Sequence, residues 1–203
     1  MDIRYSCNQR DFKRYTTEET RNEFLIQNLY VPNEVVAVYS HVDRMVTLGC
    51  MPTTEEVSID KGIDIWANFG TSYFLERREI GIFNIGGPGV IKADDETFHM
   101  NYKDCLYITM GTKNVTFASD DAANPAKFYM VSAPAHCAYK TTYLPIEKAV
   151  KRPHTTTNSL FCTTDNRVRR PTSLTLFVDV TNLGFRKLSF SASTASFITL
   201  VGL

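Results

Sequence analysis

The chain has 203 residues, of which 43% are hydrophobic and 22% charged, the composition of an ordinary globular protein with one core of normal size. Its formal net charge is zero, so composition gives no reason to expect a nucleic-acid or membrane partner. No apolar run is long enough to span a bilayer, and residues 1–4 do not open the apolar stretch that a signal peptide needs.

The cysteines point to a reducing compartment. They are odd in number, widely spaced and form no C-x-x-C pair, so neither a disulfide framework nor a zinc knuckle is indicated. We therefore expect free thiols in a cytoplasmic protein. The five positions are Cys7, Cys50, Cys105, Cys137 and Cys162.

The first 150 residues have the pattern of a β-rich domain. Residues 16–19 predict the start of a helix, and residues 35–51 predict a β-hairpin that turns at residues 41–44. Short strands separated by Gly and Asp turns follow, a spacing that predicts an all-β fold, an antiparallel jelly roll or β-sandwich. These strands are predicted at residues 80–85, 90–92, 97–100, 105–108, 115–118 and 127–131.

The composition and charge of the sequence change at residues 151–153. Residues 1–150 carry 15 Lys and Arg against 20 Asp and Glu, whereas residues 151–203 carry 7 against 2. The second region is rich in Ser and Thr, and only residues 172–180 and 196–201 have the composition of strands. We therefore expect an N-terminal domain over residues 1–150 and an irregular tail without a recognisable domain over residues 151–203.

The central stretch, residues 73–87, has the spacing of a metal-binding motif. Tyr73 and Leu75 are expected to point to the same side of a strand, Glu79 follows after three residues, and Gly86 after six more. This spacing resembles the first cupin motif, in which His-x-His, Glu and Gly hold a metal inside a small β-barrel. Because Tyr73 and Leu75 occupy the two histidine positions, the scaffold pattern is present and the ligands are not.

Longer blocks of sequence carry a more specific resemblance. Over residues 20–150 the chain resembles 5-keto-4-deoxyuronate isomerase, also called 4-deoxy-L-threo-5-hexosulose-uronate ketol-isomerase. The family's chains are longer and contain two cupin-like halves, so the resemblance implies that this region is the N-terminal half. The blocks that carry it are residues 21–25, 39–44, 70–79, 84–87, 117–119, 125–129 and 133–136.

The resemblance implies a zinc-dependent enzyme that converts 5-keto-4-deoxyuronate to 3-deoxy-D-glycero-2,5-hexodiulosonate in pectin and uronate catabolism. Zinc would polarise the carbonyl and hydroxyl oxygens and stabilise an enediolate while an acid/base group moves the proton. The resemblance also implies a homo-oligomer and a hexuronate-derived small molecule as substrate. The family's zinc ligands lie in the second half, as a His-x-His motif followed by Glu and a later His.

These ligands have no counterpart in this sequence. His154 is the one histidine after His136, and no His-x-His occurs in the chain. The counterpart of the second cupin motif is residues 109–114, with Asn114 at the ligand position. Tyr73, Leu75, Glu79 and Asn114 lack the imidazole and thiolate donors that zinc prefers, so we expect a metal-free cupin and assign no catalytic or metal-binding residue.

The break near residue 151 leaves two interpretations. A shift of reading frame would attach an unrelated tail to an N-terminal half, whereas a short relative with a diverged second half would be a protein in its own right. Two functions follow. The chain is either a hexuronate ketol-isomerase by family, or a catalytically inactive, truncated cupin with a scaffold or binding role.

Several local patterns have both a functional and a structural interpretation. The charges at residues 76–79 suggest a carboxylate clamp or, more commonly, a solvated face or interface network. His41 with Asp43 suggests an acid/base pair or a structural hydrogen bond. The others are His136–Cys137 as a thiolate–imidazole pair, residues 86–89 as a phosphate loop or a β-turn, and residues 167–170 as a nucleic-acid contact or part of the tail.

Overall fold

The structure is a computed structural model that describes residues 1–42, 44–154, 157–162, 175–181, 184–192 and 195–199. The contacts between residues divide the chain into two compact units. The first contains residues 1–9 and 28–146, and the second contains residues 10–27 and 147–203. Within the described ranges, no helix has the length and apolar character needed to cross a bilayer.

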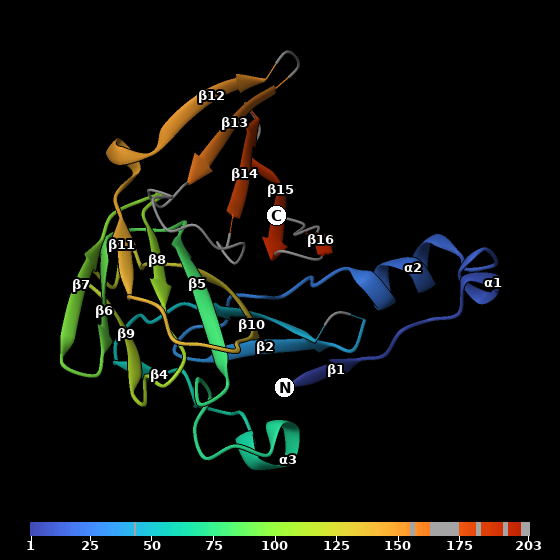
Figure 1. The fold of residues 1–203 in the computed structure, drawn as a ribbon, viewed down its shortest axis with the longest axis horizontal. Helices are drawn as coiled ribbons and strands as arrows, with labels where there is room; N and C mark the ends of the chain where they lie inside the picture. Colours follow the sequence, from blue (N-terminus) through green and yellow to red (C-terminus); the bar gives the residue numbers. More distant parts are fainter. Residues whose placement is uncertain (43, 155–156, 163–174, 182–183, 193–194, 200–203) are drawn as a thin grey trace. The chain divides into compact units, whose positions relative to one another are not determined.

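The first unit is a sandwich of two β-sheets (Figure 1). The strands of the larger sheet are β1 (Asp2–Arg4), β2 (Val35–Ser40), β3 (Met45–Cys50), β5 (Arg78–Asn84), β8 (Cys105–Ile108), β10 (Phe128–Pro134) and β11 (Thr142–Leu144). They lie in the order β1-β2-β3-β10-β5-β8-β11, and all pairs except β1–β2 are antiparallel.

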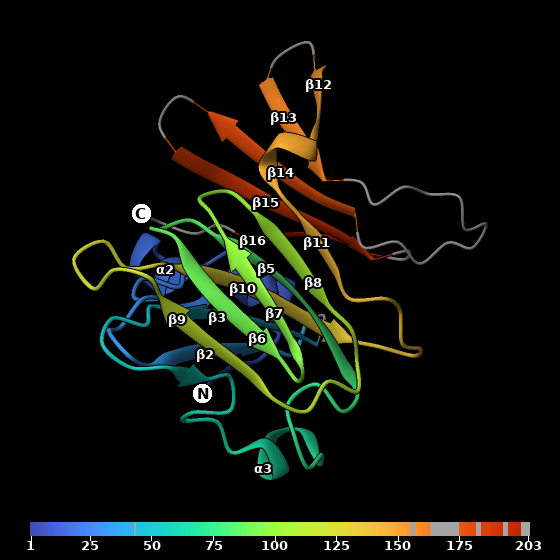
Figure 2. The ribbon, with the colours of Figure 1, turned by 90° about the vertical axis from the view of Figure 1, so that its left-hand side faces the viewer.

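The smaller sheet has four antiparallel strands in the order β4-β9-β6-β7. They are β4 (Val57–Ser58), β6 (Gly89–Ala93), β7 (Glu96–Met100) and β9 (Val115–Ser119). Figure 2 shows this sheet in front of the larger one. The arrangement confirms the all-β, cupin-type antiparallel sandwich predicted from the sequence.

One hydrophobic core lies between the two sheets. Alternate residues of each strand face it, for example Ile80 and Ile82 of β5 opposite Ile91 of β6 and Phe117 of β9, all fully buried. Each such side chain stabilises the fold by about 1.5–3 kcal/mol relative to an exposed position. The core therefore supplies the rigid frame on which the ends of the strands are held.

The predicted strands are confirmed, with ends that differ by a few residues. The hairpin expected over residues 35–51 is β2 and β3, and its polar break forms the turn. Asp94 and Asp95 connect β6 to β7, with Asp94 at the positive φ of 50° that a tight turn requires. Among the elements that the sequence interpretation did not include are β1, β4, β11, the helix α3 (Ile65–Phe69) and the 3₁₀ helix η1 (Ile146–Lys148).

The strand predicted at Tyr73 and Leu75 is wrong, because residues 73–77 form a turn that leads into β5. The backbone N–H of Glu76 bonds to the carbonyl of Tyr73 at 3.3 Å, and the Glu76 carboxylate accepts the backbone N–H of Ser72 at 2.6 Å. These local bonds hold a compact turn where alternation alone suggested an extended chain.

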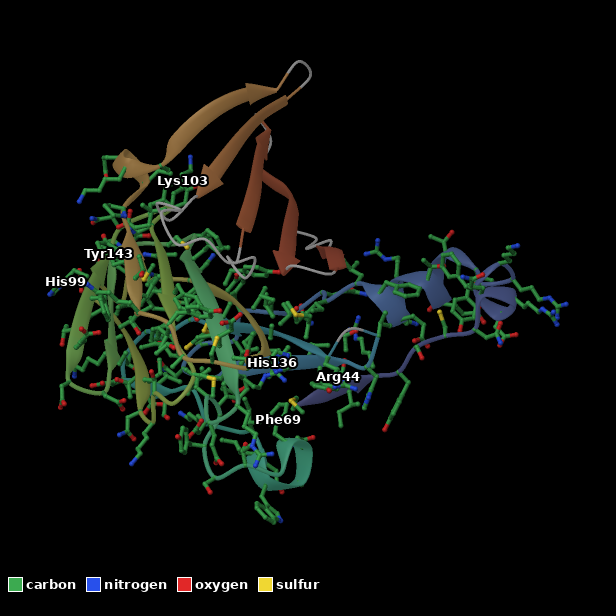
Figure 3. All side chains as sticks on the ribbon, viewed as in Figure 1. Arg44, Phe69, His99, Lys103, His136 and Tyr143 are labelled. Atoms are coloured by element: carbon green, nitrogen blue, oxygen red, sulfur yellow. The ribbon has the colours of Figure 1, made fainter. Side chains whose placement is uncertain are left out.

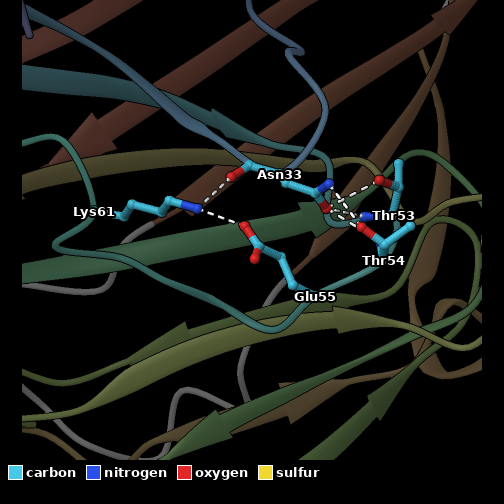
Figure 4. Close-up of polar contacts among 5 residues, drawn as sticks. All are labelled: Asn33, Thr53, Thr54, Glu55 and Lys61. Atoms are coloured by element: carbon cyan, nitrogen blue, oxygen red, sulfur yellow. Dashed lines mark hydrogen bonds and ion pairs between the residues drawn. The ribbon is translucent and has the colours of Figure 1, made fainter.

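Asn33 fixes the connection that precedes the core strands (Figure 4). Its backbone has a φ of 59°, a conformation that Asn tolerates better than most residues. Its Oδ1 accepts bonds from the backbone N–H groups of Thr53 at 2.7 Å and Thr54 at 3.1 Å, and its carbonyl accepts one from Lys61 Nζ at 3.0 Å. Lys61 Nζ also pairs with the Glu55 carboxylate at 2.6 Å. Asn33 therefore contacts the chain both before β4, at Thr53 and Thr54, and after it, at Lys61.

The second unit contains the helices α1 (Gln9–Phe12), which begins at the boundary, and α2 (Thr17–Phe24). The predicted helix start is confirmed: Thr16 and Glu19 form a capping box in which each side chain bonds to the other's backbone N–H. Phe12 packs edge-on against Phe24, with ring centroids 5.5 Å apart.

The second unit also contains five strands in the region where the sequence predicts an irregular tail. Two of them, β14 and β16, overlap the stretches at residues 172–180 and 196–201. The richness in Thr, Val and Phe gives these segments strand propensity, although the turn residues that mark strands elsewhere are scarce. The strands, in sheet order, are β12 (Val150–His154), β13 (Thr157–Cys162), β14 (Thr175–Thr181), β15 (Gly184–Ala192) and β16 (Ala195–Thr199).

Candidate functional site at the start of strand β5

Arg78 and Glu79 open β5, and their side chains leave the strand on opposite faces. Arg78 is in register with Ile80 and Ile82, which face the core, so its side chain lies on the core side of the sheet. Glu79 therefore lies on the outer side, where it bonds to a residue of β8. The alternation separates a cation and an anion that are adjacent in sequence.

Arg78 is a buried cation whose direct partners are neutral. Its Nε donates to Ser132 Oγ at 3.1 Å, and its Nη2 donates to the carbonyls of Ser132 at 2.9 Å and Arg44 at 2.8 Å. No carboxylate pairs with it among the residues that the structure describes. Burial lowers the pKa of Arg78 to about 10, which leaves the guanidinium charged at neutral pH.

Aromatic rings surround the Arg78 guanidinium and continue toward the surface. The central guanidinium carbon lies 5.2 Å from the ring centroid of Phe69 and 6.0 Å from that of Tyr39, a cation–π arrangement. Tyr39 contacts His41 edge-on at 4.8 Å, and His41 stacks on Tyr5 at 4.6 Å. Since His41 and Tyr5 are exposed, a line of rings connects the surface to Arg78.

Glu79, Tyr107 and His136 form a second group, on the outer face of the same sheet. Tyr107 on β8 donates its hydroxyl proton to the Glu79 carboxylate at 2.7 Å. Burial raises the pKa of Glu79 above its ordinary value, while the bond from Tyr107 and the nearby His136 act in the opposite direction. Burial and the bond to Glu79 also raise the pKa of Tyr107. Because the pKa of Tyr107 is raised from an already high value, its proton stays on the phenol, and Glu79 is the group of the pair that can exchange a proton.

Both groups lie at one end of the sheet. Arg78 pairs with Pro134 in the β5–β10 ladder, and the backbone N–H of Ala135 bonds to the carbonyl of Arg77. This register brings His136 to the start of β5. Figure 3 labels Arg44, Phe69 and His136, which lie in the same region of the molecule.

The four positions that correspond to cupin metal ligands do not fit zinc. Leu75 is fully buried in the core, Asn114 is exposed, and Glu79 faces away from the core side of the sheet. Tyr73 is only partly buried and lies in the turn. Within the described residues, no three His, Cys, Asp or Glu side chains gather as a metal site. A leucine and an outward carboxylate cannot form the tetrahedral donor set of zinc.

The other sequence candidates are dispersed. His41 lies in the β2–β3 turn and not on a strand, and Asp43 lies outside the described residues. His136 and Cys137 are both exposed in the segment after β10. Residues 86–89 join β5 to β6 without a helix, which agrees with a turn, and residues 167–170 lie outside the described residues.

The structural roles of Arg78, Tyr39 and Tyr107 were not identified from the sequence. For the charged run at residues 76–79 the sequence left a carboxylate clamp, a solvated face and an interface network open, and Arg78 is only 6% exposed. The alternation of residues along the strand could have predicted this burial, because Arg78 lies two and four residues before the buried Ile80 and Ile82 and so points to the same side of β5. The ring partners come from β2 and α3 and are distant in sequence, so only the fold brings them together.

Comparison with known proteins supports the family resemblance for part of the chain. The chain is 46% identical over 151 residues to the 4-deoxy-L-threo-5-hexosulose-uronate ketol-isomerase of Lachnospira eligens, a match that covers 74% of this chain and 52% of that protein. It is 47% identical over 150 residues to the enzyme of the same name from Halalkalibacterium halodurans, covering 74% and 53%. The predicted resemblance is confirmed, and the chain spans about half the length of the curated relatives it matches.

The comparison with solved structures gives more distant similarities. An IolB-like protein from Salmonella typhimurium aligns with a TM-score of 0.46 at 12% identity, covering 66% of this chain and 49% of that chain. A putative glyoxylate-induced protein from Pseudomonas aeruginosa aligns with a TM-score of 0.45 at 9% identity, covering 72% and 48%. No protein-family model matches the chain.

Proposed function

We propose that this chain acts in the isomerisation of 5-keto-4-deoxyuronate to 3-deoxy-D-glycero-2,5-hexodiulosonate, a step of pectin and uronate catabolism in the cytoplasm. The observation that carries this proposal is the 46% identity over 151 residues to a protein named as the ketol-isomerase. A match of this length and identity spans most of the sandwich, so the chain shares more than a fold with its relatives.

A ketol isomerisation moves a proton between neighbouring carbons, and its enediolate intermediate needs a nearby positive charge. In the proposed enzyme zinc supplies that charge, and the ligands for it come from outside the four cupin positions tested above. The first unit contributes a frame, and homo-oligomeric assembly with further copies of the chain is part of the proposal. No step is assigned to Glu79 or Tyr107, because they lie on the outer face of the sheet.

A second function, a cupin that binds or scaffolds without catalysis, is favoured by one specific observation. Leu75 stands at a ligand position and is built into the core, where it is 1% exposed. Restoring a ligand there would require a polar group in an apolar core, which costs free energy unless it is paired. The first unit is therefore adapted to packing at this position and not to metal binding.

One experiment separates the two functions. The full chain is purified, shown to be folded by circular dichroism, and incubated with 5-keto-4-deoxyuronate with and without added zinc, while product is followed by NMR. Calorimetric titration with zinc runs in parallel, and the relative from Lachnospira eligens serves as the positive control. Turnover by this chain supports the isomerase. A folded chain that binds no zinc at micromolar metal and gives no product rejects it and leaves the binding or scaffold role.

A further inference from the structure

Arg78 has a hydrogen-bonding nitrogen that its protein partners leave unused. The guanidinium has five N–H groups, and the bonds to Ser132 and Arg44 use those of Nε and Nη2. Nη1, which carries the other two, has no partner among the described residues. Nη1 is not fully buried, so it keeps contact with solvent.

The surroundings of this nitrogen favour an anion. A buried cation without a counter-charge is unusual, because desolvation makes an uncompensated charge costly. Its other donors hold backbone carbonyls of β10 and of the β2–β3 turn, so the guanidinium is fixed in position. The N–H groups of Nη1 point in different directions, so this nitrogen can donate one charge-assisted bond to a carboxylate oxygen.

The aromatic rings around Arg78 indicate which kind of anion would fit beside it. Phe69 and Tyr39 cover the guanidinium, and His41 and Tyr5 extend the ring line outward. One positive charge between aromatic faces matches a monoanion with a ring-shaped or apolar body better than a phosphate, which carries about −1.5 to −2 charge at neutral pH.

We propose that Arg78 anchors a binding site for a small organic carboxylate whose body lies against the rings of Tyr39, Phe69 and His41. The site is separate from the positions of cupin metal ligands and needs neither zinc nor turnover. It gives the metal-free sandwich a ligand-binding role whether or not the chain is an isomerase.

The test is a titration of the full-length chain with sodium D-galacturonate, followed by calorimetry and by NMR. The matched neutral sugar is D-galactose, and inorganic phosphate tests the alternative anion. We expect galacturonate to bind with a dissociation constant on the order of 1 mM, with no binding of D-galactose and weaker binding of phosphate. Arg78→Lys keeps the charge but removes Nη1 and the guanidinium plane that Ser132 and Arg44 hold in position, so binding should weaken at least about tenfold. Arg77→Lys, at the exposed neighbouring position, should bind as the wild type does.

Each outcome decides the proposal. Equal binding of galacturonate and D-galactose by the wild type, or no binding of galacturonate, overturns it, and so does full binding by a folded Arg78→Lys variant. If Arg78→Lys does not fold, wild-type crystals soaked in galacturonate decide. A carboxylate within hydrogen-bonding distance of Nη1 supports the site, and a carboxylate bound elsewhere rejects it. Because every readout is binding, failure here leaves the isomerase proposal to its own assay.

Discussion

The hydroxyl of Tyr143 donates to the buried carboxylate of Asp104 at 2.6 Å, and this bond joins β11 to the turn before β8. Asp104 is fully buried and also accepts the backbone N–H groups of Asn101 at 2.7 Å and Ile146 at 2.9 Å. One carboxylate thus fastens the last segment of the first unit to a turn about forty residues earlier in the chain.

Removing the hydroxyl should weaken this fastening. Tyr143→Phe leaves the charged carboxylate with one donor fewer, and bonds to charged groups contribute about 1.5–3 kcal/mol. We expect the free energy of unfolding in urea to fall by about that amount. Tyr102→Phe is the matched control, because Tyr102 is exposed, and it should change stability by less than about 0.5 kcal/mol. Equal stability of Tyr143→Phe and wild type would show that the bond contributes little.

Glu79 should make stability fall as the pH rises. Burial raises its pKa in the folded chain above the ordinary 4.5, so the folded state binds more protons than the unfolded state in that window. The free energy of unfolding contributed by this group is therefore highest at acidic pH and declines as the pH rises from about 4.5 through the folded pKa.

Glu79→Gln removes the titratable carboxyl group, while the amide oxygen of the new side chain can still accept the hydrogen bond from the Tyr107 hydroxyl. The difference in unfolding free energy, variant minus wild type, should grow more positive as the pH rises above about 4.5. Urea melts at several pH values measure it. The matched control is the same substitution at an exposed carboxylate, Glu96→Gln. A flat difference for Glu79→Gln would contradict a raised pKa at this site.

Asn33 should tolerate little substitution. Asn33→Ala removes the acceptor for Thr53 and Thr54 and leaves a β-carbon at positive φ without a compensating side-chain bond. We expect a loss of about 2 kcal/mol in unfolding free energy. Asn33→Asp keeps the acceptor and should lose less, and the exposed Asn28→Ala should be nearly neutral. An Asn33→Asp variant as unstable as Asn33→Ala would argue that the contacts of Oδ1 are not the cause.

A chain that ends at residue 149 should retain the first unit. The described core residues lie between Ala37 and Met130, with Met1 and Tyr143 packed against them. If residues 151–203 are a foreign tail, the melting temperature should stay within about 2 °C of the full chain or rise. Differential scanning calorimetry measures this. A drop of several degrees would mean that the tail packs and would reject the frame-shift interpretation, which otherwise stays a prediction.

The sheets could be predicted because their sequence signals are local. Runs such as residues 80–85 and 105–108 combine strand-forming residues with flanking Gly and Asp turns, and each became a strand. The turn at residues 73–77 could not be predicted the same way. Its conformation depends on side-chain bonds such as Glu76 to Ser72, which compete with the extended pattern.

The candidate site was predicted only in outline. The stretch around Glu79 was identified, but the motif implies that Glu79 faces the inside of the barrel, whereas the structure places it on the outer face of the sheet. Arg78 takes the core side instead, and its partners Tyr39, Phe69 and Ser132 come from three other elements. Contacts between segments this far apart leave no mark in the spacing of a single motif.

The glycines after β5 have a consequence for how such sequences are read. A β-carbon at Gly86 or Gly87 would overlap the backbone of residues 124–127, which runs directly alongside, and Asn84 bonds to both neighbouring segments. A saturation library selected for folding alone, with no ligand present, should therefore reject every side chain at these two codons. The glycines are needed here because two main-chain segments lie against each other. A motif search that takes a glycine-rich loop as a sign of nucleotide binding would return a false positive.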